Sequence, residues 1–407
     1  MVNEGFRFII NFMKNISTEP QLIAEVLNRG VDEIIDREHL EKRLKNGDCL
    51  RVKLGIDPTS PNIHLGRSIP LLKLRDFQKL GHQIVLIIGD FTGTIGDTSD
   101  KDSERPMLLE ETVQENLKNY IKQAAKIIDI DQTEIYYNSR WLGELKYKEI
   151  TNQANAFSLN EFISRDNIRR RLEAGKRISL REVLYPLMQG YDSVEVKADV
   201  EIGGTDQRFN VLAGRHLQKA AGQEPQDIIT NPLIEGLDGR KMSSSFGNTV
   251  NLLDAPNEMF GKIMSLKDEF IIKYLTLLTR LDLEKIAAYE KELKGGANPR
   301  DYKMILAAEL VKMYHSEADA AAATEYFVNT FSKKEIPSTE IVEFSPQDYH
   351  LGAVLLESGL ASSKSEIRRL LDQGGIKVDG QVVSDINFEL KVGNILQRGK
   401  IKFIKIV

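Results

Sequence analysis

Two short apolar runs with an amphipathic segment between them constrain the fold most strongly. Residues 51–57 (RVKLGID) and 83–88 (QIVLII) have the length and the β-rich, aliphatic content of buried strands. Residues 63–80 carry apolar side chains at mostly helical spacing. A strand, a helix and a second strand in this order form a unit with parallel strands. We therefore predict an α/β fold built on a Rossmann-like, doubly wound parallel sheet.

The secondary-structure signals change along the chain. A helix is predicted at residues 107–128 and a strand at residues 194–201. After about Asn251 the strand signals fade, and amphipathic helices are predicted at residues 257–314 and 317–330. The next stretch is polar, contains two prolines and lacks helical periodicity, as is typical of a linker.

These changes predict five segments. They are N-terminal helices (1–48), a Rossmann-like domain (49–250), an α-helical domain (251–332), a linker (333–348) and a small α+β domain (349–407).

Composition excludes several classes of protein. The single cysteine, Cys49, cannot form an internal disulfide or a thiolate metal site, and we expect it to be buried and unreactive in a cytoplasmic protein. The apolar run at residues 6–13 is short and contains an arginine, so we expect neither an export signal nor a membrane anchor. The net charge of −5 argues against a chain that coats nucleic acid throughout. From Asp348 onward, however, nine Lys and Arg face seven Asp and Glu, so RNA contact is expected there.

Residues 61–67 (PNIHLGR) lie where the first strand passes into its helix. Free backbone N–H groups and the helix dipole favour phosphate at such a position. His64 can donate a hydrogen bond to a phosphate oxygen, and Gly66 lets a flat base or ribose lie close to the helix. On its own the pattern fits a surface histidine near a helix start better than a nucleotide site.

A second segment, residues 241–245 (KMSSS), follows a polar, glycine-containing loop. Lys241 supplies positive charge and the serines supply hydrogen-bond donors, which suits a pyrophosphate gaining negative charge in a transition state. The alternative is a solvated, serine-rich loop.

Together these segments resemble the HIGH and KMSKS signatures of class I aminoacyl-tRNA synthetases. Over nearly the whole chain the sequence resembles the bacterial tyrosyl-tRNA synthetases. The segments that carry this resemblance are residues 55–59 (GIDPT), 89–93 (GDFTG), 96–97 (GD), 185–192 (YPLMQGYD) and 203–207 (GGTDQ). The resemblance implies activation of L-tyrosine with ATP and its transfer to tRNA(Tyr), and it implies anticodon binding by the helical domain.

Tyr185, Gln189 and Asp192 lie at i, i+4 and i+7, so one helix face should carry all three. By the resemblance, Asp192 would accept a hydrogen bond from the substrate phenol. The remaining tyrosine-binding groups that the resemblance implies are Asp97, Tyr185 and Gln189 at the α-ammonium, Gln207 near the carboxylate, and Asn138 through water.

For ATP, the resemblance implies contacts from both signatures and from three further segments. The implied ATP-binding residues are Thr59, His64, Gly66, Gly204, Asp206, Lys241 and Ser244. Lys101 and Arg105 would lie on a loop at the pyrophosphate, although a charge cluster of this kind is commonly a solvated surface. Mg²⁺ would arrive bound to ATP.

Three positions depart from the commonest family pattern. Arg67 replaces the second histidine of HIGH, and Ser244 replaces the second lysine of KMSKS. Arg67 can still reach phosphate, whereas Ser244 removes one cation. Lys53 replaces a tyrosine that binds the phenol in many members, and it could pair partly with Asp192.

The last segment has a predicted helix start at Ser362-Ser363 and a predicted hairpin at residues 378–381 (VDGQ). The basic residues Lys364, Arg368 and Arg369 should share one helix face. The segment resembles the small RNA-binding fold of ribosomal small-subunit protein S-four, which implies contact with tRNA phosphates.

Three other interpretations stay open at this point. A tryptophanyl-tRNA synthetase shares the fold and both signatures but does not need Asp192 against a phenol. A synthetase relative that has lost catalysis could survive as an RNA-binding protein, which Arg67 and Ser244 allow. A generic nucleotide-binding transferase would leave the basic C-terminal segment unexplained. By the resemblance we also expect a homodimer.

Overall fold

The computed structural model describes residues 16–99, 107–332, 341–361, 363–399 and 402–407. Lys101, Arg105, the run at residues 6–13 and part of the expected linker lie outside them. The chain divides into two compact units, residues 1–321 and 322–407. The five predicted segments stay a prediction. In the described residues, no helix combines the length and the apolar composition needed to cross a membrane.

The first unit is built on a six-stranded sheet with the order β1-β6-β5-β2-β3-β4. Its strands are β1 (Glu33–Ile35), β2 (Arg51–Ile56), β3 (Gln83–Ile88), β4 (Thr133–Tyr137), β5 (Val200–Gly204) and β6 (Asp227–Asn231). All neighbours are parallel except β1, which runs antiparallel to β6. The chain moves outward from β2 through β3 to β4 and returns to place β5 on the other side of β2. The predicted doubly wound, Rossmann-like sheet is confirmed, and its order reverses between β2 and β5.

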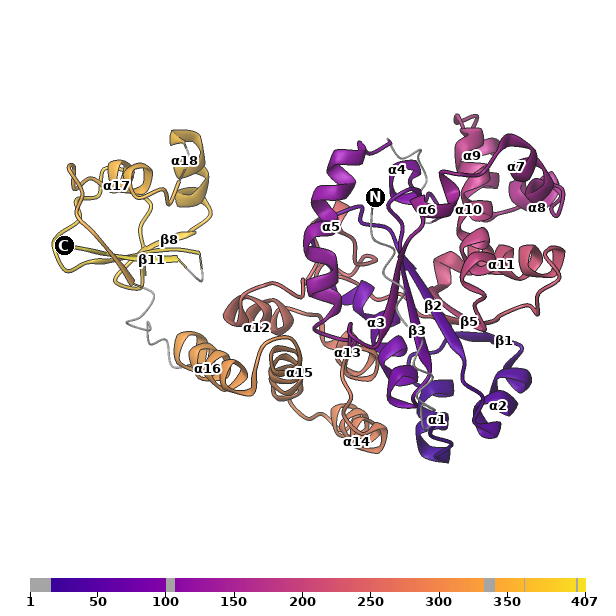
Figure 1. The fold of residues 1–407 in the computed structure, drawn as a ribbon. Coiled ribbons are helices and arrows are strands. Elements are labelled where there is room, and N and C mark those ends of the chain that lie inside the picture. Colours follow the sequence, from indigo (N-terminus) through magenta and orange to yellow (C-terminus); the bar gives the residue numbers. More distant parts are fainter. Residues whose placement is uncertain (1–15, 100–106, 333–340, 362, 400–401) are drawn as a thin grey trace, which may run out of the picture. The chain divides into compact units, whose positions relative to one another are not determined.

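Helices cover both faces of this sheet. The helices up to β5 are α1 (Pro20–Asn28), α2 (Arg37–Asn46), α3 (Leu65–Lys79), α4 (Thr92–Ile95), α5 (Glu110–Ala124), α6 (Ser139–Leu142), α7 (Tyr147–Ala154), α8 (Leu159–Ile163), α9 (Asp166–Glu173) and α10 (Leu180–Val196). After β5 come α11 (Arg208–Ala220), α12 (Pro256–Met264), α13 (Ile271–Leu278), α14 (Leu283–Lys294) and α15 (Pro299–Tyr314), and α16 (Glu317–Phe327) spans the boundary between the two units. In Figure 1, α3 and α5 lie on one side of the sheet and α10 and α11 on the other. The central strands are buried on both faces, as expected for parallel strands covered by helices.

Most predicted elements are confirmed within a few residues, but the strand expected at residues 194–201 is wrong. Val194 and Val196 belong to the last turn of α10. The helix ends because Lys197 adopts a left-handed conformation with φ 50° and the N–H of Ala198 returns to the carbonyl of Ser193 at 3.1 Å. Strand β5 starts only at Val200. The expected burial of the cysteine is also wrong, because Cys49 is exposed.

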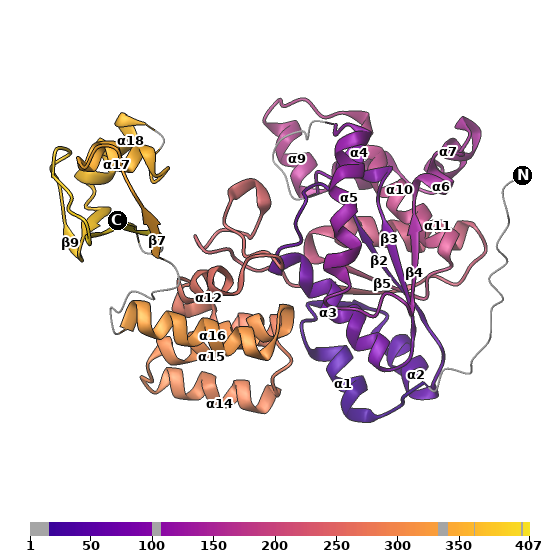
Figure 2. The same ribbon diagram turned by 60° about the vertical axis from the view of Figure 1, so that its left-hand side comes forward.

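The second unit contains a small α+β fold. A five-stranded sheet has the order β7-β11-β10-β8-β9. The elements are β7 (Ile341–Phe344), α17 (Leu351–Glu357), α18 (Lys364–Asp372), β8 (Ile376–Val378), β9 (Gln381–Val382), β10 (Ile395–Arg398) and β11 (Lys402–Ile406). Figure 2 shows α17 and α18 close to this sheet, and buried aliphatic side chains from helices and strands form one core.

Both local predictions in this unit are confirmed. Ser363 caps α18, where its hydroxyl accepts the backbone N–H of Glu366 at 3.2 Å. The hairpin pairs Val378 with Gln381 across Asp379 and Gly380. Both turn residues have positive φ, 49° and 81°, as a two-residue turn of this hand requires.

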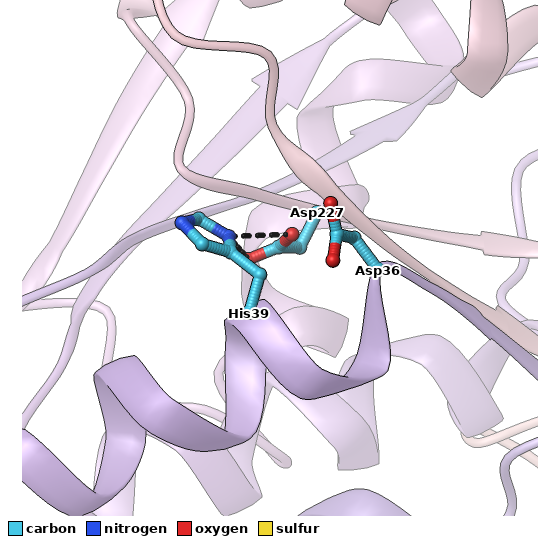
Figure 3. Close-up of side chains that lie close together, drawn as sticks. All are labelled: Asp36, His39 and Asp227. Atoms are coloured by element: carbon cyan, nitrogen blue, oxygen red, sulfur yellow. Dashed lines mark hydrogen bonds and ion pairs between the residues drawn. The ribbon is translucent and has the colours of Figure 1, made fainter.

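A contact between His39 and Asp227 ties α2 to strand β6 of the sheet, and Asp36 lies beside the pair (Figure 3). The Nδ1 of His39 lies 3.0 Å from both carboxylate oxygens of the buried Asp227. Its Nε2 lies 3.3 Å from Glu224, and the carboxylate of Asp36 lies close to the pair. The guanidinium of Arg215 lies 3.9 Å from Asp36, which disfavours a cation here. The contacts are those of a protonated histidine held by carboxylates rather than of a metal site.

We expect this cluster to make the stability of the first unit depend on pH. The hydrogen bond to Asp227 raises the pKa of His39. A raised histidine pKa stabilises the fold fully below the ordinary value, about 6.5, and this stabilisation is lost as the pH rises through the folded-state pKa. Burial also raises the pKa of Asp227. The fold therefore loses stability as Asp227 ionises, but this loss occurs in the acid range, below the pH values compared here.

Urea unfolding followed by the fluorescence of the single tryptophan, Trp141 in the first unit, tests this. The loss of unfolding free energy caused by His39→Gln should be larger at pH 6 than at pH 9. Glu38→Gln, on the same helix, is the control and should show no such difference. An equal loss at both pH values for His39→Gln would contradict the assignment.

Candidate active site

The site residues gather at the carboxyl ends of β2 and β5, where the strand order of the sheet reverses. Open α/β sheets bind ligands at this position because the loops after the two strands diverge there. Asp57 and Thr59 follow β2 directly, and Asp206 and Gln207 follow β5 in a single 3₁₀ turn. The sheet topology thus brings together residues about 150 positions apart in the sequence.

His64 caps the start of α3 with an extended backbone, and its imidazole is buried. Burial, together with the charges of Arg67 and Lys241, lowers its pKa to about 3. The ring is therefore neutral at pH 7, with one N–H donor. Among the described residues its buried Nδ1 has no hydrogen-bond partner. A side chain at position 66 would place its Cβ only 3.1 Å from the imidazole of His64. Glycine avoids this close contact.

The two signature segments are in contact. The backbone N–H of Gly66 points to the sulfur of Met242 at 3.3 Å. The hydroxyls of Ser244 and Ser60 lie 3.4 Å apart. The Nζ of Lys241 donates to Asp206 at 2.9 Å. The sequence predicted that both segments serve one nucleotide, and the structure places them at one site.

Arg67 lies inside the site rather than on its surface. Its guanidinium donates to the hydroxyl of Thr59 at 2.8 Å, to the hydroxyl of Tyr120 and to the carbonyl of Asp57 at 3.4 Å. These contacts fix the turn after β2. A histidine could not make all three, because it has at most two ring donors.

Asp192 is the most deeply buried carboxylate of the predicted amino-acid site, with 3% of its surface exposed. The indole N–H of Trp141 donates to one of its oxygens at 2.8 Å, and the amide of Asn138 approaches the other at 3.3 Å. Burial raises the pKa of Asp192 to about 7, while Lys53, Trp141 and Asn138 favour the ionised form and limit the rise. The carboxyl group is thus poised to exchange a hydrogen bond near neutral pH.

Lys53 does not take Asp192 as its ion partner. Its fully buried Nζ lies 3.0 Å from Glu201 and donates to the hydroxyl of Ser193 at 2.7 Å. The side-chain amide of Gln189 also approaches Glu201, at 3.3 Å. The departure at Lys53 is therefore compensated within the fold, and a tyrosine-binding role for Lys53 and Gln189 stays a prediction.

Tyr185 and Asp97 complete the group. The hydroxyl of Tyr185 donates to Asp57 at 2.8 Å, and burial raises the pKa of Asp57 to about 6. The amide of Gln207 donates to Asp97 at 2.6 Å and to the hydroxyl of Ser99 at 2.9 Å. The structure therefore places Tyr185, Asp97 and Gln207 in one polar network around the ends of β2 and β5.

Sequence reasoning missed three residues of this site as functional candidates. Trp141 is the only tryptophan of the chain, which was a usable signal. Asp57 belongs to the segment at residues 55–59, for which only Thr59 was given a role. Glu201 belongs to the strand that was wrongly predicted at residues 194–201. Gly204 ends β5, and its ATP-binding role stays a prediction. In the second unit, Lys364, Arg368 and Arg369 are all exposed on α18, whereas Ile367 and Leu371 are buried.

Comparison with known proteins agrees with this arrangement. The family described as tRNA synthetases class I (W and Y) matches residues 45–332, and the S4 domain matches residues 351–396. A tyrosine–tRNA ligase of Thermotoga maritima is 47% identical over 392 residues, which cover 95% of this chain and 98% of that protein. A tyrosine–tRNA ligase of Mannheimia succiniciproducens is 45% identical, with the same coverage.

Solved structures share the fold at lower identity. A tyrosyl-tRNA synthetase from Archaeoglobus fulgidus complexed with L-tyrosine has a TM-score of 0.60 at 23% identity, covering 75% of this chain and 99% of that one. A truncated mitochondrial enzyme from Aspergillus nidulans has a TM-score of 0.65 at 20% identity, covering 76% and 94%. With the family match over most of its length and close to half of its residues shared with tyrosine–tRNA ligases, this chain belongs to the class I aminoacyl-tRNA synthetases, within the tyrosine–tRNA ligases, and it carries a C-terminal S4 domain.

Proposed function

We propose that this chain activates L-tyrosine with MgATP to form tyrosyl-adenylate and pyrophosphate, and then transfers tyrosine to the 3′-terminal adenosine of tRNA(Tyr). The observation that carries the proposal is the buried carboxylate of Asp192, which Trp141 and Asn138 hold by hydrogen bonds. The other two family-level alternatives lack this support. A tryptophan substrate offers no phenol to Asp192, and an inactive relative has no need of an intact His64, Lys241 and Asp206 set.

The first step needs positioning rather than a protein nucleophile. The carboxylate of tyrosine is ionised at pH 7 and attacks the α-phosphorus of ATP, with pyrophosphate leaving in line. His64, being neutral, can donate one hydrogen bond to the phosphates, and Lys241 and Ser244 would stabilise the leaving group. Asp206 would hold the ribose, and Thr59 and Gly66 would line the phosphate and base.

Asp192 provides selection for tyrosine. A phenol O–H can donate to its carboxylate, and Trp141 keeps that carboxylate oriented through the 2.8 Å hydrogen bond. Phenylalanine would leave the buried carboxyl group without this partner, at a cost of about 1–3 kcal/mol or more. The site therefore rejects phenylalanine by an unsatisfied polar group rather than by size.

Amino-acid-dependent ATP–pyrophosphate exchange tests both the activity and the site. We expect exchange with tyrosine and not with phenylalanine or tryptophan. Asp192→Asn and Trp141→Phe should each raise the KM for tyrosine, by about 10-fold to 150-fold for a lost hydrogen bond to a charged group. Tyr191→Phe is the control, because this neighbouring hydroxyl contacts Glu195 instead. Exchange with tryptophan would overturn the substrate, and no exchange with any amino acid would favour an inactive relative.

Six exposed apolar side chains support a homodimer. They lie on the four consecutive helices α7 to α10, which Figure 1 draws at one end of the first unit. They are Tyr147 (84% exposed), Leu159 (64%), Ile163 (37%), Leu172 (49%), Leu180 (77%) and Leu184 (40%). Exposed apolar side chains on neighbouring helices are a common feature of protein interfaces.

Size-exclusion chromatography with light scattering tests the dimer. The wild-type chain should elute with the mass of two copies at micromolar concentration, and Leu180→Asp should shift it toward one copy. Leu283→Asp, at a partly exposed leucine on α14, is the control and should remain dimeric. A wild-type mass of one chain would contradict the proposal.

The S4 domain would contact tRNA phosphates through the basic face of α18. Replacing Arg368 and Arg369 by glutamine should leave pyrophosphate exchange unchanged. It should raise the KM for tRNA and make aminoacylation less dependent on salt, because fewer counterions are released on binding. The control replaces two exposed lysines of α2, Lys42 and Lys45, by glutamine. Unchanged tRNA kinetics in the arginine variant would exclude α18 as the contact.

We place the whole reaction in the cytoplasm, which also suits the single, exposed thiol.

A further inference from the structure

One face of α5 carries three polar side chains that contact the first signature segment. Asn116, Tyr120 and Gln123 lie at i, i+4 and i+7 of this helix, so they share one face. Tyr120 and Gln123 are buried, and Asn116 is half-buried. Buried polar groups require hydrogen-bond partners. All three side chains find such partners in residues 57–67, which comprise the loop between β2 and α3 and the first turn of α3.

Gln123 holds the backbone immediately before His64. Its side-chain oxygen accepts the N–H of Ile63 at 2.8 Å, and its amide donates to the carbonyl of Pro61 at 3.0 Å. On the other side, the carbonyl of Ile63 accepts the N–H of Leu252 at 2.9 Å. The buried Nδ1 of His64 has no hydrogen-bond partner among the described residues. The position of this imidazole therefore depends on the backbone that Gln123 holds.

The other two residues of this face hold the turn that contains Thr59. The amide of Asn116 donates to the carbonyl of Pro58 at 2.8 Å. The hydroxyl of Tyr120 accepts a hydrogen bond from the guanidinium of Arg67, which also donates to the hydroxyl of Thr59 at 2.8 Å. Tyr120 therefore acts on Thr59 through Arg67, the residue that departs from the family pattern.

The helix that carries this face is itself held in place. It lies on the same side of the sheet as α3 (Figure 1), and it buries Val113, Leu117 and Ala124. Just beyond its end, the Nζ of Lys126 donates to the carbonyl of Tyr314 at 2.7 Å. Side chains on a packed helix can hold a neighbouring loop within the small tolerance that a reacting site requires.

We infer that the polar face of α5 positions the loop between β2 and α3 for ATP, so that Asn116, Tyr120 and Gln123 are positioning residues of the activation step. The inference rests on the proposed function, in which Thr59 and His64 contact ATP. One helix holds the backbone at both of these contacts. Misplacing a reacting group by about 1 Å can slow a reaction about 100-fold, so loss of this support affects ATP and leaves tyrosine binding nearly unchanged.

Replacing Gln123 tests the support of His64. Gln123→Met should raise the Kd for MgATP about twofold to tenfold, the effect of a lost hydrogen bond. It should also slow single-turnover formation of tyrosyl-adenylate about tenfold or more. The KM for tyrosine should stay within about twofold of the wild-type value, because Gln123 makes no contact with the residues around Asp192.

Gln218→Met is the matched control. Gln218 is an equally buried glutamine that also holds backbone groups, since it accepts the N–H of Gln226 and donates to the carbonyl of Ala198, both at 2.8 Å. These groups lie at the amino ends of β5 and β6, whereas the site lies at the carboxyl ends. The control should lose stability but keep the wild-type Kd for MgATP.

A double-mutant cycle tests whether Tyr120 acts through Arg67. In the wild-type background, Tyr120→Phe should raise the Kd for MgATP about twofold to tenfold. In the Arg67→Met background, which lacks the donor, the same replacement should have no further effect. Tyr302→Phe is the control, because its hydroxyl contacts Glu292 at 2.6 Å on another helix, and it should leave ATP binding unchanged.

Isothermal titration calorimetry gives the Kd for MgATP without requiring catalysis. Weaker ATP binding in Gln123→Met and Tyr120→Phe, with both controls unchanged, would support the inference. Unchanged ATP binding in both variants, an equal change in Gln218→Met, or an equal effect of Tyr120→Phe in both backgrounds would overturn it. Absence of pyrophosphate exchange in the wild type would refute the proposed function, and the dissociation constants for MgATP would still decide this inference.

Discussion

The ion pair between Lys53 and Glu201 holds together the two strands on which the site is built. The two residues lie directly opposite each other on β2 and β5, the neighbours between which the sheet reverses its order. Both side chains are fully buried, 3.0 Å apart. Glu201 accepts further hydrogen bonds from Ser193 and Gln226, so the charges are well satisfied. Removing one partner of such a pair commonly costs about 3–5 kcal/mol, because the other charge is left buried.

This pair explains how the site tolerates lysine at position 53. The lysine is directed beneath α10 and neutralises Glu201, so it is not available as the ion partner of Asp192. The direct hydrogen bonds of Asp192 therefore come from neutral donors, the indole of Trp141 and the amide of Asn138. These donors and the charge of Lys53 offset burial only in part, and the pKa of Asp192 accordingly rises to about 7. A group that changes protonation near neutral pH can either accept from or donate to a phenol.

The sequence predicts what depends on local pattern. The strand–helix–strand unit, the turn at Asp379-Gly380 and the cap at Ser363 follow from periodicity and turn chemistry, and all three are confirmed. The misplaced strand at residues 194–201 arose because two valines in the last turn of a helix resemble the start of a strand. The residue that ends this helix in a left-handed conformation is Lys197. Glycine is usual at this position, so the sequence did not mark the helix end.

What the sequence could not predict are pairings between distant positions. Lys53 and Glu201 are 148 residues apart, and Trp141 and Asp192 are 51 residues apart. Neither contact has a local signature, because each depends on which strands become neighbours and on how far α10 extends. The resemblance supplied Asp192 and Asn138 but not Trp141, the donor at the shorter distance.

The contact between Lys241 and Asp206 joins two residues that are both expected to bind ATP. The resemblance gives these residues to opposite ends of ATP, the pyrophosphate and the ribose, yet they pair with each other at 2.9 Å. ATP binding therefore has to exchange this pair for contacts to the nucleotide. The pair is partly exposed, 32% at the lysine and 19% at the aspartate, and ion pairs of this kind contribute only about 0–1 kcal/mol. It can hold the loop of Lys241 against the site and still be displaced at little cost when the nucleotide arrives.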